Sequence, residues 1–157
     1  MCFLTYKWEM SDIDIMDFRN GRNNKMRISR TLEYGLTAAV FIAQNCKDGL
    51  VMAKKISEAY DIPTEYLLQV MQKLVKSGIL TSKKGPRGGF NLARPAKEIT
   101  MLEIIEAIDG PVIVPMNLAE QTGKPFAKKI EKMFLNVSEA MKVTLAKVTL
   151  ADLAGKK

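Results

Sequence analysis

The stretch Ile62–Arg94, IPTEYLLQVMQKLVKSGILTSKKGPRGGFNLAR, constrains the fold more than any other part of this sequence. Its first half predicts a helix with one buried face, because apolar residues recur at spacings of three and four; they are Leu67, Val70, Met71, Leu74 and Val75. Gly78 supplies the left-handed residue that commonly ends a helix. The second half predicts strands over Ile79–Ser82 and Phe90–Leu92, since Gly85–Gly89 can only form a turn.

The remaining side chains of this stretch are suited to contact with DNA. The polar face of the helix can reach base edges or phosphates; it carries Glu65, Tyr66, Gln69, Gln72, Lys73 and Lys76. Lys83, Lys84 and Arg87 lie at the tip of the predicted hairpin, where they can reach phosphates or the minor groove. A helix followed by a hairpin with a basic tip is the layout of a winged helix, whose helix enters the major groove.

Two further helices are predicted upstream. Ala53–Tyr60 joins the first helix of the stretch through Asp61–Pro63, which makes a helix-turn-helix. The alternative is an ordinary helical hairpin in a core, and the wing that follows favours the helix-turn-helix. Thr31–Ala43 is apolar nearly all round, so we expect it to be mostly buried. Gly35 inside this helix predicts close packing against another helix, because glycine is otherwise costly there.

The formal net charge of the chain is +7, and all of it lies in the middle of the sequence. Residues 27–97 hold twelve Lys and Arg against five Asp and Glu, whereas residues 1–25 hold four of each and residues 98–157 hold eight of each. A generally soluble basic surface would spread the excess along the chain. Its concentration on the candidate DNA-binding segment favours an anionic partner.

The cysteine and histidine content argues against an enzyme or a metal protein. The chain has two distant cysteines, Cys2 and Cys46, and no histidine. Two such cysteines give neither a disulfide framework nor a metal-ligand spacing, which is typical of the reducing cytoplasm. Without histidine the usual triads and zinc sites lack their commonest member, and no apolar run approaches the roughly 20 residues of a membrane helix. We expect a cytoplasmic protein that is not an enzyme and carries no metal or other cofactor.

Residues 1–25 differ from everything that follows. Acidic residues interrupt their apolar positions, so they do not form a signal peptide. Two interpretations stay open: an N-terminal arm that docks on another surface, or translation that begins at Met26. The codons of Gly21-Arg22 permit a purine-rich ribosome-binding sequence just upstream of Met26, and we favour the later start.

The C-terminal part predicts helices separated by a loop. Thr100 and Glu103 have the spacing of a capping box, which opens a helix that ends at Asp109-Gly110. Residues 111–125 predict a loop because they contain prolines and a glycine. Thr149 is expected to cap a final turn over Leu150–Ala154.

The longest predicted helix runs from Phe126 to about Lys147. Its apolar residues step by three and four, close to a coiled-coil seam; they are Ile130, Phe134, Val137, Met141, Leu145 and Val148. A long helix after a complete small domain has little of its own chain to pack against. The seam therefore predicts a homodimer interface, with packing within one chain as the alternative. We divide the chain into an extension (1–25), a winged helix-turn-helix domain (26–110), a loop (111–125), and a dimerisation helix with a tail (126–157).

With these segments assembled, the chain resembles the Rrf2 family of bacterial winged-helix regulators from Met26 to about Ala154. The resemblance rests on short motifs, the most specific being the glycine-rich wing and the tyrosine-leucine pair; they are Arg27-Ile28-Ser29, Leu32-Glu33-Tyr34-Gly35-Leu36, Ile62-Pro63, Tyr66-Leu67, Gly85–Phe90 and Thr149–Leu153. It implies a dimeric transcription regulator, most often a repressor, that binds a near-palindromic operator. Because residues 1–25 lie outside the resemblance, it adds weight to a start at Met26.

The resemblance also implies roles for individual residues. Tyr66 and Gln69 occupy positions of recognition-helix contacts, with Thr64 and Glu65 at the N-terminal end of that helix. Lys84 stands where members commonly place an arginine in the minor groove, and Arg27 resembles a contact to a backbone phosphate near the first helix.

One departure from the family pattern changes the expected signal. Iron–sulfur members carry three cysteines in the loop before the long helix, and residues 111–125 contain none. A cluster needs thiolates or comparable ligands, so we expect a cluster-free regulator that responds to a small molecule or a partner protein. The sequence thus predicts a mainly helical winged helix-turn-helix with a small β-wing and a long dimerisation helix. Its predicted function is a sequence-specific, double-stranded DNA-binding repressor, and the alternative is a winged-helix module that binds protein instead of DNA.

Overall fold

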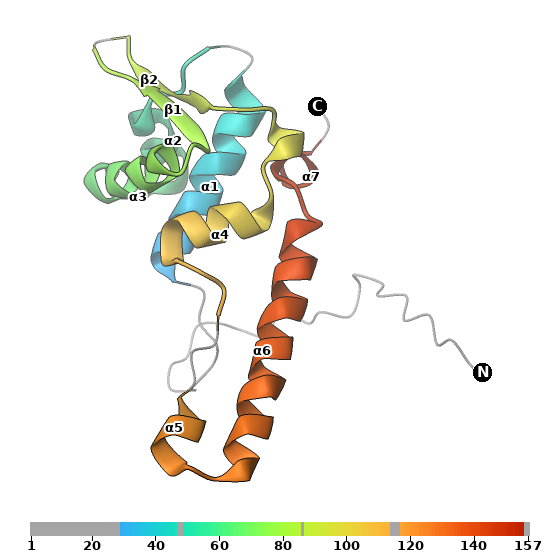
Figure 1. The fold of residues 1–157 in the computed structure, drawn as a ribbon. Helices are drawn as coiled ribbons and strands as arrows, with labels where there is room; N and C mark the ends of the chain where they lie inside the picture. The colour runs from blue at the N-terminus through green and yellow to red at the C-terminus, as the bar shows by residue number, and fades with distance from the viewer. Residues whose placement is uncertain (1–28, 47–48, 86, 114–116, 156–157) are drawn as a thin grey trace, which may run out of the picture.

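The computed structural model describes residues 29–46, 49–85, 87–113 and 117–155 (Figure 1). Arg27 and the N-terminal extension lie outside these residues. The predicted mainly helical fold with a small wing is confirmed. The elements are α1 (Arg30–Asn45), α2 (Ala53–Tyr60), α3 (Thr64–Lys76), β1 (Leu80–Lys83), β2 (Gly89–Leu92), the 3-10 helix η2 (Ala96–Glu98), α4 (Met101–Asp109), α5 (Leu118–Thr122), α6 (Pro125–Ala146) and α7 (Leu150–Ala154).

The core forms around α1, which packs against α3, α4 and α7. The close packing predicted at Gly35 is confirmed. A Cβ atom added to Gly35 would lie 2.2 Å from Cδ1 of Ile108 on α4 and 3.1 Å from Cγ1 of Val70 on α3. The three helices therefore meet where α1 has no side chain, and a larger residue at this position would require the Ile108 side chain to move.

The turn between α2 and α3 fixes the start of the candidate recognition helix. Asp61 ends α2 in the left-handed conformation, with φ of 51°, a region that aspartate tolerates better than most residues. Ile62 then enters the core, and the Ser57 hydroxyl donates to its carbonyl oxygen at 2.6 Å. The buried face predicted for α3 is confirmed for Leu67, Val70, Met71 and Leu74, which lie in the core, whereas Val75 is half-buried against it.

The wing is a two-stranded antiparallel sheet in which Leu80 pairs with Leu92 and Lys83 with Gly89. Val51, from the segment before α2, adds a short bridge through its backbone hydrogen bonds to Phe90. The turn is too tight for a side chain at Gly88, where an added Cβ would lie 2.2 Å from the carbonyl oxygen of Lys83. This close approach explains the glycine between the strands.

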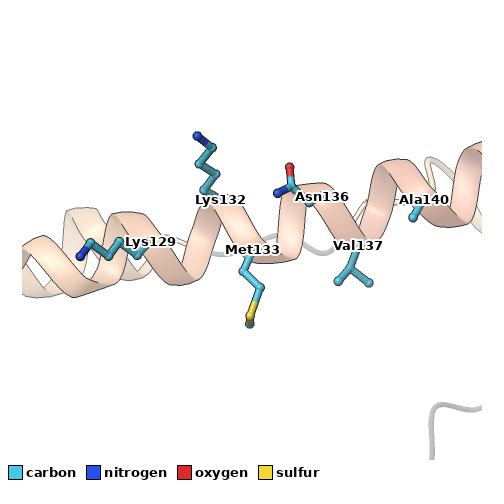
Figure 2. A pocket seen from close by; sticks show the side chains of 6 residues that line it. All are labelled: Lys129, Lys132, Met133, Asn136, Val137 and Ala140. Atoms are coloured by element: carbon cyan, nitrogen blue, oxygen red, sulfur yellow. The ribbon is translucent and has the colours of Figure 1, made fainter. Parts of the chain in front are cut away.

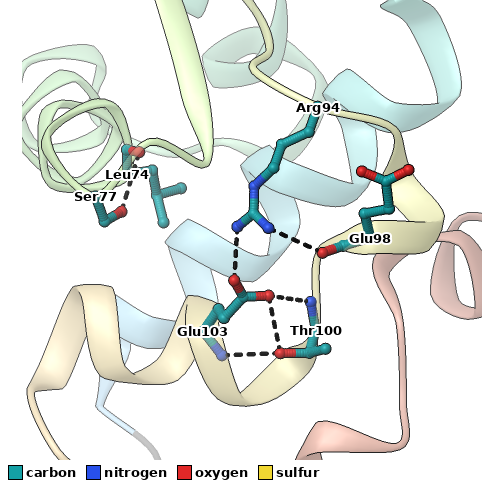
Figure 3. Close-up of polar contacts among 6 residues, drawn as sticks. All are labelled: Leu74, Ser77, Arg94, Glu98, Thr100 and Glu103. Carbon is teal, nitrogen blue, oxygen red and sulfur yellow. Dashed lines mark hydrogen bonds and ion pairs between the residues drawn. The ribbon is translucent and has the colours of Figure 1, made fainter.

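A polar network ties the end of the wing to the start of α4 (Figure 3). Arg94 donates to the Glu103 carboxylate at 2.6 Å and to the backbone carbonyl of Glu98 at 3.0 Å. The predicted capping box is confirmed, since Thr100 and Glu103 exchange hydrogen bonds. Burial by itself would raise the pKa of Glu103, but the hydrogen bonds from Thr100 and Arg94 outweigh it and lower the pKa below the usual 4.5.

The loop predicted over residues 111–125 is only partly a loop, because α5 lies within it. The backbone N–H of Ala119, at the start of α5, donates at 2.7 Å to the carboxylate of Glu131 on α6. Gly123 ends α5 in the left-handed conformation. The prediction missed this helix because its cap comes from a side chain twelve residues further along the chain.

The long helix α6 extends away from the winged-helix body, with α5 beside its far end (Figure 1). Its near end is tied back by hydrogen bonds from the Met101 N–H to the Val148 carbonyl and from the Leu150 N–H to the Ile99 carbonyl, both at 2.8 Å. Thr149 caps α7 as predicted, and Leu150 is fully buried in the main core. Within the described ranges no helix is long and apolar enough to cross a membrane.

Candidate nucleic-acid interface

The outer face of α3 presents a stripe of polar side chains along the whole helix. An α-helix advances by about 100° per residue, so positions 65, 69, 72 and 76 fall on one line opposite the buried face. The residues on that line are Glu65, Gln69, Gln72 and Lys76, and all are exposed. Their carboxylate, amide and ammonium groups match the donors and acceptors of base edges and phosphates in a major groove.

Three other predicted contact residues on α3 have hydrogen-bond partners inside the chain. The Tyr66 hydroxyl bonds to the Thr31 hydroxyl on α1, and the Tyr66 ring meets the Tyr34 ring edge to face at 5.6 Å. The Thr64 hydroxyl pairs with the Ser57 hydroxyl at 2.7 Å. The Lys73 ammonium donates to the Ile108 carbonyl on α4 at 2.8 Å. The structure thus places Tyr66 and Lys73 on the side of α3 that faces α1 and α4.

The basic wing tip lies on the same part of the molecule as α3. Lys83, Lys84 and Arg87 are all exposed. β1 packs against α3 in the body, whereas the turn projects beyond it (Figure 1). A hairpin whose base packs on the recognition helix holds its cationic tip at a fixed place relative to that helix.

Sequence reasoning missed one residue of this surface. Leu68 lies on the flank of the polar stripe and is 38% exposed. The spacing of apolar residues could have predicted that Leu68 is exposed, because Leu68 falls outside the buried set of Leu67, Val70, Met71 and Leu74. An exposed leucine here is suited to contact a thymine methyl group.

The predicted dimer seam lies along one face of α6, and its last residue, Val148, follows just after the helix ends. Most of its residues are half-buried within the single chain; they are Ile130, Phe134, Met141, Leu145 and Val148. Val137 is 45% exposed and shares a face with the exposed Met133. Figure 2 shows these two side chains pointing to one side of α6, while Lys132 and Asn136 point to the other. All four line a hollow along the helix.

The described residues do not fit an iron–sulfur cluster. They contain no group of three or more His, Cys, Asp or Glu side chains that could hold a metal ion. Cys46 lies at the C-terminal end of α1, where its thiol donates to the Ala43 carbonyl. A cluster held by thiolates would need several such donors in one place.

These features define a class of protein: a helix-turn-helix, a two-stranded wing and an exposed polar stripe on the second helix form a winged-helix DNA-binding regulator. Known proteins agree with this assignment. The profile of the Rrf2 family, described as an iron-dependent transcriptional regulator, matches residues 28–156. This chain belongs to the Rrf2 family, as its motifs predicted.

Two individual members of the family are similar to this chain in sequence. CymR of Bacillus subtilis, an HTH-type transcriptional regulator, is 32% identical over 129 residues, which cover 82% of this chain and 90% of CymR. IscR of Cereibacter sphaeroides is 38% identical over 89 residues, but this match spans only 55% of this chain and 57% of IscR. The solved structure of CymR, the global cysteine regulator of B. subtilis, superposes with a TM-score of 0.70 at 28% identity and covers 83% of this chain and 97% of CymR.

Proposed function

We propose that this chain is a sequence-specific repressor that binds a near-palindromic operator as a homodimer and carries no iron–sulfur cluster. The observation that carries the proposal is the polar stripe of α3 beside the exposed basic wing. In each half-site, Glu65 and Gln69 read base edges in the major groove, with Thr64 and Tyr66 near the N-terminal end of the helix. Lys83, Lys84 and Arg87 bind phosphates or the adjacent minor groove, and Arg27 binds a backbone phosphate.

The homodimer is supported by α6. Phe126, Met133 and Val137 are 54%, 53% and 45% exposed in the single chain. By helix geometry they lie within about 40° of one another around the axis, so they form one apolar strip. Exposed apolar strips of this kind are usually covered by another protein surface. A second copy of α6 is the partner we propose, because two copies would place two recognition helices on one operator.

The cluster-free state is supported by the lack of cysteine and histidine side chains that could bind iron. The segment from Gly110 to Pro125 contains no cysteine, and the whole chain contains no histidine. The signal that controls the repressor is then a small molecule or a partner protein. A cytoplasmic location and the lack of an enzymatic activity follow from the same proposal.

Selection of bound genomic fragments by the purified full chain tests the DNA-binding role. We expect enrichment of fragments that share an inverted repeat, with half-sites about one turn of DNA apart. The reason is that a dimer with two-fold symmetry binds a site with the same symmetry. Retention on heparin that falls steeply between low and high salt would accompany this. Recovery of fragments with no shared sequence, together with weak heparin retention, would favour the protein-binding alternative.

A separate measurement tests the cluster-free proposal. Protein purified without oxygen from iron-replete cells should be colourless, and neither chelators nor air should change its affinity for the selected operator. A brown preparation that bleaches in air would contradict the proposal, and it would mean that donors other than histidines and loop cysteines hold a cluster.

A further inference from the structure

Lys73 lies beside the DNA-facing stripe of α3 and not within it. The stripe residues Glu65, Gln69, Gln72 and Lys76 cluster around one direction, and Lys73 is turned from that direction by about 70° toward α4. Its ammonium lies 2.8 Å from the carbonyl oxygen of Ile108. Both Lys73 and Lys76 are exposed. The Lys73 ammonium is nevertheless hydrogen-bonded to the end of α4, whereas Lys76, three residues later, lies on the outer face of α3.

The acceptor of this hydrogen bond is at the C-terminal end of α4. The last four carbonyl groups of an α-helix have no partner within the helix, and cations are favoured there by the helix dipole. The last turn of α4 contains no basic residue of its own. Lys73 supplies from α3 the positive charge and the donor that this helix end lacks.

The same end of α4 is also fixed to α1. The side chain of Ile108 fills the space left open by Gly35, and Ser29, which caps α1, donates to the Asp109 carboxylate, both oxygens of which lie 2.9 Å away. Ser29 simultaneously accepts from the Leu32 N–H at 3.0 Å. The end of α4 thus forms a platform held by α1, and Lys73 attaches the second half of α3 to that platform.

We propose that Lys73 is a positioning residue for DNA recognition: its ammonium holds α3 on the end of α4, so that the polar stripe meets the major groove at the right angle, and it neutralises no phosphate. This inference rests on the proposed function. It separates two effects that a lysine on a recognition helix can have. A phosphate contact strengthens binding to every sequence and steepens the salt dependence, whereas a positioning contact strengthens binding to the operator alone.

The test compares Lys73→Met with Lys76→Met in the full chain. Each change removes one ammonium and keeps an unbranched side chain. Affinities are measured for the selected operator and for unrelated DNA of equal length, between about 50 and 300 mM salt. We expect Lys73→Met to weaken operator binding roughly tenfold, with unchanged affinity for unrelated DNA and an unchanged salt slope. Lys76→Met should weaken both DNAs alike and flatten the slope by about 0.9 per phosphate lost, or roughly two units per dimer.

Amide hydrogen exchange without DNA provides the second readout. Lys73→Met should speed exchange at the last turn of α4, including the Gly110 N–H that bonds to the Glu106 carbonyl, whereas Lys76→Met should not. Lys73→Arg, which keeps a cationic donor, should retain wild-type behaviour in both assays. The proposal is overturned if Lys73→Met flattens the salt slope as Lys76→Met does, or if it changes neither specificity nor exchange. A wild-type chain that prefers no DNA sequence would instead overturn the proposed function, and the exchange result would still decide whether Lys73 holds α4.

Discussion

Gln69 is the single residue from which we expect the largest contribution to sequence preference. It lies at the centre of the outer stripe of α3 and is exposed, and its amide can donate and accept in the plane of one base. A bidentate contact of this kind is worth about 1–3 kcal/mol of discrimination. Gln69→Ala should therefore lower the preference for the operator over a single-base variant by that amount in competition binding. Gln121→Ala, which removes the same amide from α5, is the control, and an unchanged preference in Gln69→Ala would mean that this side chain reads no base.

The Glu103 carboxylate should make the stability of the fold depend on pH. Its pKa is lower in the folded chain than in the unfolded chain, because the hydrogen bonds from Thr100 and Arg94 outweigh the effect of burial. The folded state therefore binds this proton less readily, and the stabilisation is complete above the unfolded value near 4.5 and is lost as the pH falls through the lower, folded value.

Glu103→Gln should remove that part of the pH dependence. The difference in melting temperature between neutral and acidic solution should become smaller than in the wild type, while stability at neutral pH falls by less than about 1 kcal/mol because the ion pair is partly exposed. Glu98→Gln is the matched control, since only the backbone of Glu98 bonds to Arg94. Equal pH curves for the wild type and Glu103→Gln would show that the pKa of Glu103 does not change on folding.

Among the secondary-structure elements, the wing should contribute affinity more than sequence preference. Lys84 is exposed beside the tight turn, and a dimer presents two such wings. Lys84→Ala should flatten the plot of log affinity against log salt by roughly one to two units, since each phosphate contact contributes about 0.9. Lys124→Ala removes the same charge at the start of α6, at the far end of the molecule, and should leave the slope unchanged. A wild-type slope in Lys84→Ala would place the wing away from the DNA.

The helix α6 should hold the dimer through its exposed strip. Val137 is 45% exposed in the single chain, so Val137→Lys leaves the fold of one chain intact but buries an unpaired charge in the proposed interface. Sedimentation should show a monomer, with operator binding greatly weakened. Leu135→Lys is the control, because Leu135 is similarly exposed at 58% but faces about 160° away around the helix. A dimer that survives Val137→Lys would place the interface elsewhere.

Across the complete fold, the parts predicted correctly from the sequence were those with local causes. The buried face of α3, the capping box at Thr100, the cap at Thr149, and the close packing at Gly35 each follow from residues a few positions apart or from the cost of one residue type. The short helix α5 was missed because its cap comes from Glu131 on another helix. Spacing placed Lys73 on the polar face, but could not show that a carbonyl of α4 lies within its reach.

The return of α7 to α1 has a consequence for how this protein is made in the cell. Leu150 is fully buried in the core that supports α3, and Gln44 on α1 donates to the Ala154 carbonyl at 3.0 Å. The core of the DNA-binding body is thus completed by residues that a ribosome adds after the whole of α6. A nascent chain, or a product of premature termination before Leu150, lacks that residue in its core. Every chain with a finished DNA-binding body therefore already carries the long helix through which, in our proposal, it pairs with a second copy.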